Sequence, residues 1–500
     1  MKTEPQRAQS LACLGLASIL SAALTLGGGC DESSPPLSPP PPTTQPPSPP
    51  PPEDPLTDLD RYVKSKDPTY SWSLRQTVPG AGYTTYLIDM KSVTWRSPTE
   101  VDRTEWQHNL AIVKPDNPTP GPSMLLISGG SNSGTPPTAA PTLAVQLAKG
   151  TGRIVVNLGQ VPNQPLTFAN HDGMPHTEDG IIAFSWAQVM KTSDPTWSAR
   201  FPMVKSAVLA MDTAQEFMRS GAGGGIQLDK FVVAGASKRG WTTWLTAAVD
   251  ARVVGAVPIV IDVLNVEKFM VQHFESYGFW ANSLYDYFYN HITEHIGQKD
   301  LTFMLANEDP YLFRKRLTMP KYMVNASGDQ FFLPDGSQNY FDDLPGEKYL
   351  RYVPNADHSL NGTDAFDGVA AYLQSLDDAA PRPRFSWKFE GSETLRVQTL
   401  DKPEKVVLWQ ATNPLARDFR VEKIGKVWQG SELTDQGSGQ GGGVYVGTVA
   451  TPAKGYSAFF IELTFANAPR LPLKFTTQVR VLPEARPFAG QDPRAGQLEK

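Results

Sequence analysis

The chain has 500 residues, with 45 Lys and Arg against 51 Asp and Glu, and a formal net charge of −6. This mildly acidic balance, without a stripe of basic residues interleaved with aromatics, argues against a nucleic-acid-binding surface. The length allows one large and one small domain, or about three domains of average size. We therefore expect no nucleic-acid partner.

The first 30 residues have the features of a secretion signal rather than of a folded element. A charged start precedes an apolar run from Leu11 to Leu26, and three glycines, Gly27 to Gly29, lead to Cys30. A cysteine after small residues resembles the bacterial lipobox, in which the cysteine carries the lipid, although Gly27 stands where leucine is expected. We expect a signal peptide of the lipoprotein type over residues 1–30. An ordinary cleaved signal or an N-terminal membrane anchor is the alternative.

This signal predicts an exported protein, located in the cell envelope or in the extracellular or periplasmic space. Residues 31–55 then form a proline-rich linker, with 12 prolines among the 18 positions from Pro35 to Pro52. As a polyproline II spacer rising about 3.1 Å per residue, it would hold a folded domain roughly 50 Å from a membrane. We expect membrane contact only through a lipid on Cys30.

From residue 56 to about residue 380 the pattern predicts an α/β fold. Three short strands come first and form the sheet edge. Continuous apolar strands then alternate with amphipathic helices, which indicates a mostly parallel sheet covered by helices on both faces. The expected strands are Tyr70–Thr77, Thr84–Met90, Trp106–Lys114, Ser123–Ser128, Arg153–Leu158, Lys230–Ala234, Val253–Ile261, Lys321–Asn325 and Tyr349–Val353. The expected helices include Pro141–Lys149, Asp179–Met190, Met203–Met218 and Trp241–Ala248.

Between Ile261 and Pro320 no strand is expected, and the stretch is rich in Phe, Tyr, Trp and His. Buried core helices can have this composition. We interpret about residues 265–316 as a lid inserted over a substrate pocket, since aromatic side chains form pocket walls.

After about residue 380, apolar and polar residues alternate in short runs separated by turn residues. This pattern is typical of a small all-β unit. We expect a C-terminal β-sandwich over residues 381–485 and a tail over residues 486–500.

The stretch FVVAGASKRG, residues 231–240, has the pattern of a nucleophile elbow, in which a serine follows a buried strand and precedes a helix. The usual spacing is G-x-S-x-G. Gly235 stands two residues before Ser237, but Arg239 stands two residues after it and the second glycine is Gly240. Taken alone, the stretch fits equally well a glycine-rich turn whose serine caps the helix.

The acid and the histidine that such a serine needs follow in the expected chain order. The strand KYMVN leads to Asp329, and the strand YLRYV leads to His358. Ser237 would be the nucleophile, His358 the general base and acid, and Asp329 the group that orients the imidazole. Asp262, after the run VPIVI, is the alternative acid. The other six histidines are expected to be satisfied core or surface residues.

A tetrahedral intermediate also needs donors directed at its oxyanion. The backbone N–H of Lys238 is one candidate, and the loop after SMLLIS offers a second from Gly130 or Ser131, unless this loop is only a tight turn. The Lys238 side chain would add positive charge near the site or point outward. That of Arg239 is expected to point outward. Glu178 begins a helix, where an acid favours the helix dipole.

The sequence gives little support to metal or cofactor chemistry. It contains no HExxH and no CxxC pattern, and the pair His291 and His295 is expected on a polar helix face. The run GAGGG at residues 221–225 precedes a strand instead of following one, so it is not a dinucleotide-binding motif. We expect no cofactor and no metal.

Three long strings carry a family resemblance: GASKRGWTTWLTAAVDARVVGAVPIVIDVLN, MPKYMVNASGDQFFLPD and LRYVPNADHSL. Over about residues 56–480 the chain closely resembles the PhoPQ-activated pathogenicity-related protein family. The resemblance implies an α/β-hydrolase-like domain with a C-terminal β domain, a secreted or envelope location, and a triad at Ser237, Asp329 and His358. The G-x-S-x-x-G spacing also resembles that of glucuronoyl esterases, a similarity limited to the elbow.

The sequence therefore predicts a serine hydrolase that cleaves an ester or amide bond through an acyl-enzyme. Its substrate would be a small molecule, a glycan or a peptide. The triad alone does not separate a peptidase from a carbohydrate or carboxyl esterase. A different class of function is a non-catalytic signalling or binding protein on a hydrolase scaffold, because a fold does not fix a function.

Overall fold

The computed structural model describes residues 56–169, 171–376, 381–437 and 442–500. The expected signal peptide, the lipidation site Cys30 and the proline-rich linker lie outside these ranges. Residues 55–500 form one unit. Within the described ranges, none of the helices is both long and apolar enough to cross a lipid bilayer.

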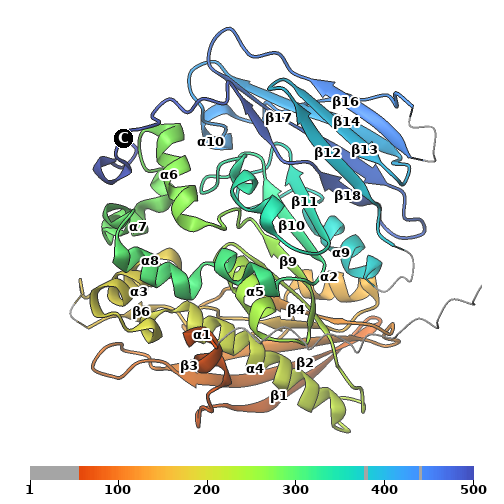
Figure 1. The fold of residues 1–500 in the computed structure, drawn as a ribbon. Helices are drawn as coiled ribbons and strands as arrows, with labels where there is room; N and C mark the ends of the chain where they lie inside the picture. The colour runs from red at the N-terminus through yellow and green to blue at the C-terminus, as the bar shows by residue number, and fades with distance from the viewer. Residues whose placement is uncertain (1–55, 170, 377–380, 438–441) are drawn as a thin grey trace, which may run out of the picture. The chain divides into compact units, whose positions relative to one another are not determined.

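A 14-stranded sheet is the centre of this unit (Figure 1). The order across it is β1-β2-β3-β5-β4-β8-β9-β10-β11-β18-β17-β14-β15, with β19 paired to β17. The strands are β1 (Ser71–Gly80), β2 (Tyr83–Thr94), β3 (Glu105–Pro115), β4 (Ser123–Ile127), β5 (Val155–Leu158), β8 (Phe231–Ala236), β9 (Val253–Ile259), β10 (Lys321–Ala326), β11 (Lys348–Val353), β14 (Lys405–Asn413), β15 (Gln429–Glu432), β17 (Tyr456–Phe465), β18 (Leu473–Thr476) and β19 (Arg480–Leu482).

The first nine strands of this order confirm the predicted α/β fold. From β5 to β11 all neighbours pair in parallel, and β1, β2 and β3 form the antiparallel edge. The exchange of β5 and β4 relative to chain order, with crossover helices on both faces and an elbow after β8, is the α/β-hydrolase fold. Every residue of β4 and β5 is buried, which explains why their sequences are mostly apolar and do not alternate with polar residues.

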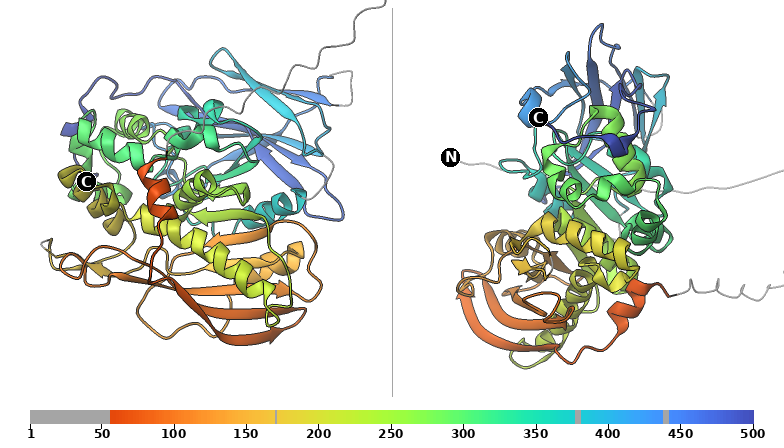
Figure 2. Two further views of the ribbon diagram at one scale, coloured as in Figure 1. Left: turned by 60° about the horizontal axis from the view of Figure 1, so that its bottom comes forward. Right: turned by 90° about the vertical axis from the view of Figure 1, so that its left-hand side faces the viewer.

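Helices cover both faces of the parallel part, each packed over its own apolar core. On one face lie α4 and α5, and on the other lie α2 and α9 (Figures 1 and 2). The helices are α1 (Asp58–Lys64), α2 (Thr142–Thr151), α3 (Glu178–Thr192), α4 (Arg200–Arg219), α5 (Lys238–Val249), α6 (Val266–Tyr277), α7 (Tyr285–Tyr289), α8 (Lys299–Glu308), α9 (Ala365–Ser375) and α10 (Val421–Ile424).

A helical insertion separates β9 from β10, where the sequence predicts a lid. It contains α6, α7 and α8, of which α7 and α8 pack on α3. The last residues of the chain pack on the same insertion, because the N–H of Trp280 donates to the carbonyl of Gln497 and the N–H of Glu499 donates to the carbonyl of Trp280. The expected tail is thus in contact with the insertion.

The C-terminal strands form two layers, as the predicted sandwich requires. A three-stranded sheet of β12 (Phe385–Glu390), β13 (Thr394–Thr399) and β16 (Gly443–Thr448) is one layer. It packs on β14 and β17, since Gly447 lies against Leu408 and Ile461. The second layer continues the central sheet, because β18 pairs with β11 at Leu350 and Thr476. The sequence does not reveal that the sandwich shares this layer with the hydrolase sheet.

Candidate functional site

Ser237 lies at a sharp turn between β8 and α5. Its φ of 57° and ψ of −126° form a backbone conformation that residues other than glycine rarely adopt. Its side chain caps no backbone group of α5 and is half-buried. The helix-capping interpretation of this serine is therefore not what the structure shows. The strained turn presents the hydroxyl at the carboxyl end of the parallel strands.

The glycine spacing around Ser237 follows from how closely α5 approaches two strands. A Cβ atom on Gly235 would lie 2.6 Å from the carbonyl oxygen of Arg239, so this position tolerates no side chain. A Cβ atom on Gly240 would lie 2.7 Å from Cγ2 of Ile261 and 2.9 Å from the carbonyl oxygen of Gly235. The second close approach thus falls three residues after the serine, which accounts for the G-x-S-x-x-G pattern.

Asp329 and His358, from the loops after β10 and β11, are in contact. Nδ1 of His358 lies 2.8 Å from Oδ2 and 3.0 Å from Oδ1 of Asp329. The backbone N–H of Phe331 donates to the same carboxylate at 2.8 Å, and the carboxylate is buried. The imidazole packs on the ring of Phe331, with centroids 4.5 Å apart, and is 20% exposed. The histidine is therefore oriented from one side by the carboxylate.

Ser237 and the loop that carries Asp329 border one apolar cavity. Ser237, Phe331 and Phe332 all line it, and both of these rings contact His358. In the described chain no hydrogen bond joins the Ser237 hydroxyl to His358. Catalytic hydrogen bonds are often long without substrate and tighten when it binds.

The alternative acid, Asp262, does not contact His358. Its carboxylate accepts hydrogen bonds from the hydroxyls of Tyr340 at 2.6 Å and Tyr352 at 2.5 Å, and is fully buried. Burial raises the pKa of Asp262 to about 7, although the two hydroxyls act to lower it. In the structure, therefore, Asp329 is the acid that contacts the imidazole of His358, and Asp262 belongs to a separate polar cluster.

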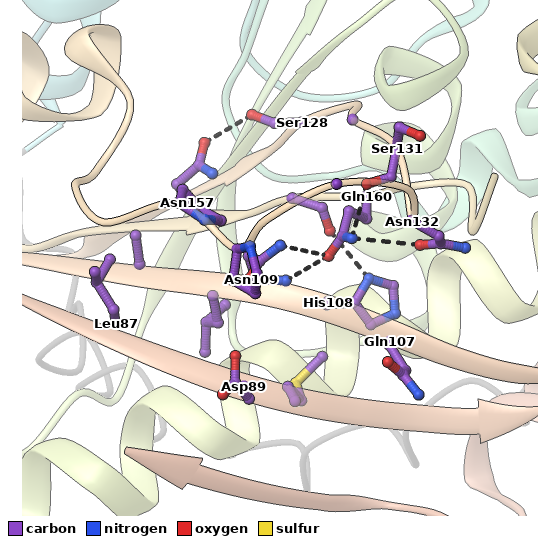
Figure 3. Close-up of a pocket in the computed structure, with 18 of the residues that line it drawn as sticks. Leu87, Asp89, Gln107, His108, Asn109, Ser128, Ser131, Asn132, Asn157 and Gln160 are labelled. Carbon is purple, nitrogen blue, oxygen red and sulfur yellow. Dashed lines mark hydrogen bonds between the residues drawn. The ribbon is translucent and has the colours of Figure 1, made fainter. Parts of the chain in front are cut away.

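The predicted oxyanion donors are available. The backbone N–H groups of Lys238, Gly130 and Ser131 have no hydrogen-bond partner among the described residues. This is expected, because the first N–H groups of a helix have no partner within the helix, and an open loop also leaves N–H groups unpaired. Gln160 holds the loop in place, since its Nε2 donates to the carbonyl of Ser131 and its Oε1 accepts from Asn109 (Figure 3). The loop is thus held by the side chain of Gln160, which follows β5 and is itself anchored to Asn109 of β3, and it is more than a tight turn.

The apolar cavity over Ser237 is small. Its volume is about 70 Å³, against about 300–1,000 Å³ for sites of drug-sized ligands. The insertion supplies much of its wall, and Trp186 and Trp241 also line it. The residues from the insertion are Val266, Phe269, Met270, Trp280, Leu284, Tyr287 and Thr293. The insertion therefore has the position expected of a lid.

A second, larger cleft of about 820 Å³ lies beside the oxyanion loop (Figure 3). Loop residues Gly129 to Gly134 line one side of it, and strands β1 to β3 line the other. Its labelled side chains are mostly polar, among them Asp89, Gln107 and Asn157. It offers hydrogen-bonding groups where the apolar cavity offers almost none.

The two basic residues after the serine form ion pairs with acidic residues at the start of α3. Lys238 Nζ lies 2.8 Å from Glu178 and 3.1 Å from Asp179, and Arg239 binds both oxygens of Glu178. The outward orientation predicted for Arg239 is wrong, since its side chain is 11% exposed and is held by Glu178. Burial acts to raise the pKa of Glu178, but the two cations outweigh it and lower the pKa to about 2.

A buried ion pair below the elbow was not predicted. Arg200 donates to the carbonyl of Lys238 at 2.8 Å, and its guanidinium lies 4.3 Å from the ring of Trp241. Glu308 is 3.5 Å from Nε of Arg200 and accepts from the indole of Trp186. The pair holds the start of α5. No local pattern marks it, because its members come from α4 and α8.

The histidines other than His358 fall into three groups. His108 and His273 are buried, and burial lowers their pKa values to about 4 and about 3, as expected of core histidines. His291 and His295 each pair with one nearby acid. His171 and His176 differ, because they share Asp172. The string HDGMPH could have drawn attention to this last group.

Comparisons with known proteins agree with the resemblance seen in the sequence. The sequence model of the PhoPQ-activated pathogenicity-related protein family matches residues 59–420. Autocrine proliferation repressor protein A from Dictyostelium discoideum is 37% identical over 462 residues, which cover 86% of this chain and 92% of that protein.

Similar solved structures include three esterases. The acetyl xylan esterase from Paenibacillus sp. R4 has a TM-score of 0.45 at 16% identity, covering 64% of this chain and 92% of that chain. Acetyl xylan esterase 1 from Thermoanaerobacterium sp. JW/SL YS485 has a TM-score of 0.43 at 15% identity, with coverages of 64% and 94%. The glucuronoyl esterase from Solibacter usitatus has a TM-score of 0.33 at 15% identity, with coverages of 56% and 75%.

Proposed function

The chain belongs to the PhoPQ-activated pathogenicity-related protein family, and from the geometry of its site we propose that it is a serine hydrolase cleaving an ester or amide bond. The observation that carries the proposal is the strained Ser237 at an elbow, which shares one cavity with two phenylalanine rings that pack against His358, the partner of Asp329. In an α/β-hydrolase these are the three strand ends that carry the nucleophile, the acid and the histidine.

The proposed reaction has two steps. Ser237 Oγ attacks the carbonyl carbon while His358 takes its proton, and the oxyanion accepts from the N–H of Lys238 and of Gly130 or Ser131. Collapse of the intermediate breaks the ester or amide bond as His358 returns the proton to the leaving group. Water, activated by the same imidazole, then releases the acyl group from Ser237. Asp329 keeps the imidazole oriented and stabilises its charged form.

The two cavities support a division of the substrate. The cavity at Ser237 is small and apolar and would accept a short acyl group, whereas the polar cleft beside the oxyanion loop would accept a glycan or peptide portion. A panel of aminoacyl 4-nitroanilides, 4-nitrophenyl esters of increasing acyl length, and acetyl and uronoyl sugar esters separates peptidase from esterase. We expect the shortest acyl esters to react fastest.

The test of the proposed function is labelling by a fluorescent fluorophosphonate. The wild-type chain should be labelled, and Ser237→Ala and His358→Ala should not. Ser431→Ala is the matched control, because Ser431 is exposed on the edge strand β15, and it should be labelled like the wild type. A folded wild-type protein that resists labelling would count against the proposal.

A second candidate is a signalling or binding protein without catalysis. Two observations favour it: the absence of a Ser237–His358 hydrogen bond in the described chain, and the relative named as an autocrine proliferation repressor. For this candidate the biological effect of the protein should survive Ser237→Ala unchanged. Loss of the effect in that variant, with the fold intact, would favour the hydrolase.

We also propose export and lipid attachment at Cys30, which the sequence features of residues 1–30 support. Cys30→Ser should move the protein from the membrane fraction to the soluble exported fraction. Equal membrane association of the two forms would argue for an N-terminal anchor instead.

A further inference from the structure

Two histidines and one aspartate gather in the loop before α3. Their ligating atoms all lie within 4.8 Å of one another. Nε2 of His176 lies 2.9 Å from Oδ1 of Asp172, and Nε2 of His171 lies 3.8 Å from Oδ2 of the same carboxylate. One carboxylate therefore stands between two imidazole nitrogens.

His171 is held in place although its Nε2 atom is unsatisfied. This nitrogen is buried and makes no hydrogen bond. The ring lies 4.5 Å from the ring of Phe184 and 4.9 Å from that of His176, measured between centroids. A buried polar atom without a partner costs free energy unless something else satisfies it.

These distances fit a small divalent cation. Zinc binds imidazole nitrogen at about 2.0–2.1 Å and carboxylate oxygen at about 2.0–2.2 Å, so two ligands of a tetrahedral ion lie about 3.3–3.5 Å apart. The observed separations of 2.9 and 3.8 Å lie on either side of this value. We propose that His171, Asp172 and His176 bind one Zn²⁺ ion, with a fourth position left for water.

The position of His171, Asp172 and His176 in the fold indicates what a bound ion would stabilise. His176 ends the small hairpin of β6 (Leu166–Thr167) and β7 (Pro175–His176), and α3 begins two residues later (Figure 1). The ring of Tyr289, at the end of α7, is 6.4 Å from that of His171. The ion would fix the hairpin loop at the start of α3, where Glu178 and Asp179 hold Lys238.

The chain contains a matched control for this site. His291 pairs with Glu294 and His295 pairs with Asp300, each at 2.7 Å. Each of these histidines has one acidic partner, whereas His171 and His176 share one carboxylate. A hexahistidine tag must be absent from the protein, because it binds the same ions.

The experiment is calorimetric titration of Zn²⁺ into the untagged full chain after treatment with a chelator. We expect one equivalent of Zn²⁺ bound by the wild type and by His291→Ala. His171→Ala and His176→Ala should bind at least about tenfold more weakly. Zn²⁺ should also raise the unfolding temperature of the wild type and not that of His176→Ala. Unchanged binding in the two site variants would overturn the proposal, and so would an equal loss in His291→Ala.

A measurement on the wild type alone keeps the test decisive if the variants do not fold. X-ray absorption at the zinc edge counts the imidazole ligands of the bound ion. Two imidazoles and two oxygen ligands support the site. Fewer than two imidazoles, or no binding at all, contradict it. Neither outcome depends on the reactivity of Ser237, so failure of this site and failure of the hydrolase are distinguishable.

Discussion

The ends of β9 and β10 lie side by side in the sheet, and each is followed by a buried aspartate. Asp262 comes three residues after Ile259, the last residue of β9, and Asp329 comes three residues after Ala326, the last of β10. Asp262 accepts from two tyrosine hydroxyls, whereas Asp329 contacts His358 and accepts from a backbone N–H. Position and burial are the same, so the partner decides what each carboxylate can do.

This difference has a physical basis. A hydroxyl donates more strongly to an ionised carboxylate than to a protonated one, so the two tyrosines act to lower the pKa of Asp262, but they oppose the effect of burial only in part. An imidazole that becomes charged during a reaction is stabilised by an ionised carboxylate. Asp329 is therefore suited to support His358, and Asp262 is suited to hold a proton inside the protein.

The largest expected effect breaks this comparison directly. Asp329→Asn should lower the rate of 4-nitrophenyl acetate hydrolysis about 10⁴-fold, because the imidazole loses its orienting partner. Asp262→Asn should change that rate less than about tenfold, since Asp262 does not touch His358. Both rates are measured on protein whose circular dichroism matches the wild type. Equal losses in the two variants would show that the two strand ends act together.

The second effect concerns pH and stability. In the folded protein the pKa of Asp262 is raised from 3.8 to about 7, with burial as the main cause. The folded state then holds a proton that the unfolded state has released, so the contribution of Asp262 to stability is greatest below about pH 4 and is lost as pH rises through about 7. The loss is at most about 4 kcal/mol.

Asp262→Asn cannot titrate, and it isolates this contribution. The free energy of unfolding in urea should favour the variant over the wild type more at about pH 8 than at about pH 4. All other groups titrate in both proteins, so the difference reports Asp262. A difference that is independent of pH would mean that Asp262 is ionised in the folded state throughout.

The sequence predicts the strand ends because their signals are local. Hydrophobic patterns mark β8, β10 and β11, and Ser237, Asp329 and His358 follow these strands within five residues. The choice between Asp329 and Asp262 is not local, because it depends on which side chain the imidazole reaches across the sheet edge. The prediction that the Arg239 side chain points outward is wrong for the same reason, since its partner Glu178 comes from another helix.

The same limit applies to the C-terminal strands. Alternation of apolar and polar residues predicts that they form a sheet, but any edge strand offers the same backbone groups for pairing. The pairing of Leu350 with Thr476 therefore leaves no signal in either segment. Lys238, Gly130 and Ser131 could be predicted as donors because backbone N–H groups need no side-chain signal.

The end of a third strand, β8, is constrained by close packing rather than by charge. Gly240→Ala should destabilise the protein by about 1–3 kcal/mol, because the new Cβ would lie 2.7 Å from Ile261 and 2.9 Å from a backbone oxygen. Gly150→Ala, also in a helix but with no atom within 4 Å of its Cβ, should be neutral or stabilise by up to about 1 kcal/mol. Urea unfolding measures both. Similar results for the two would mean that α5 moves away at little cost.

The smallest effect concerns Glu178, a third carboxylate whose partners are cations. Glu178→Gln should cost about 1–2 kcal/mol at neutral pH, less than for a fully buried pair, because the Glu178 side chain is 39% exposed and Lys238 keeps Asp179. Its pKa is lowered to about 2, so the wild type has this stability above about pH 4.5 and loses it as pH falls toward 2. The difference between wild type and variant in urea unfolding should therefore shrink over that range.

Asp401→Asn removes an exposed ion pair with Arg384 and should cost less than about 0.5 kcal/mol at any pH. If Glu178→Gln behaves like Asp401→Asn, the pairing of Glu178 with Lys238 and Arg239 does not stabilise the elbow, and Arg200 and the glycine contacts hold it instead.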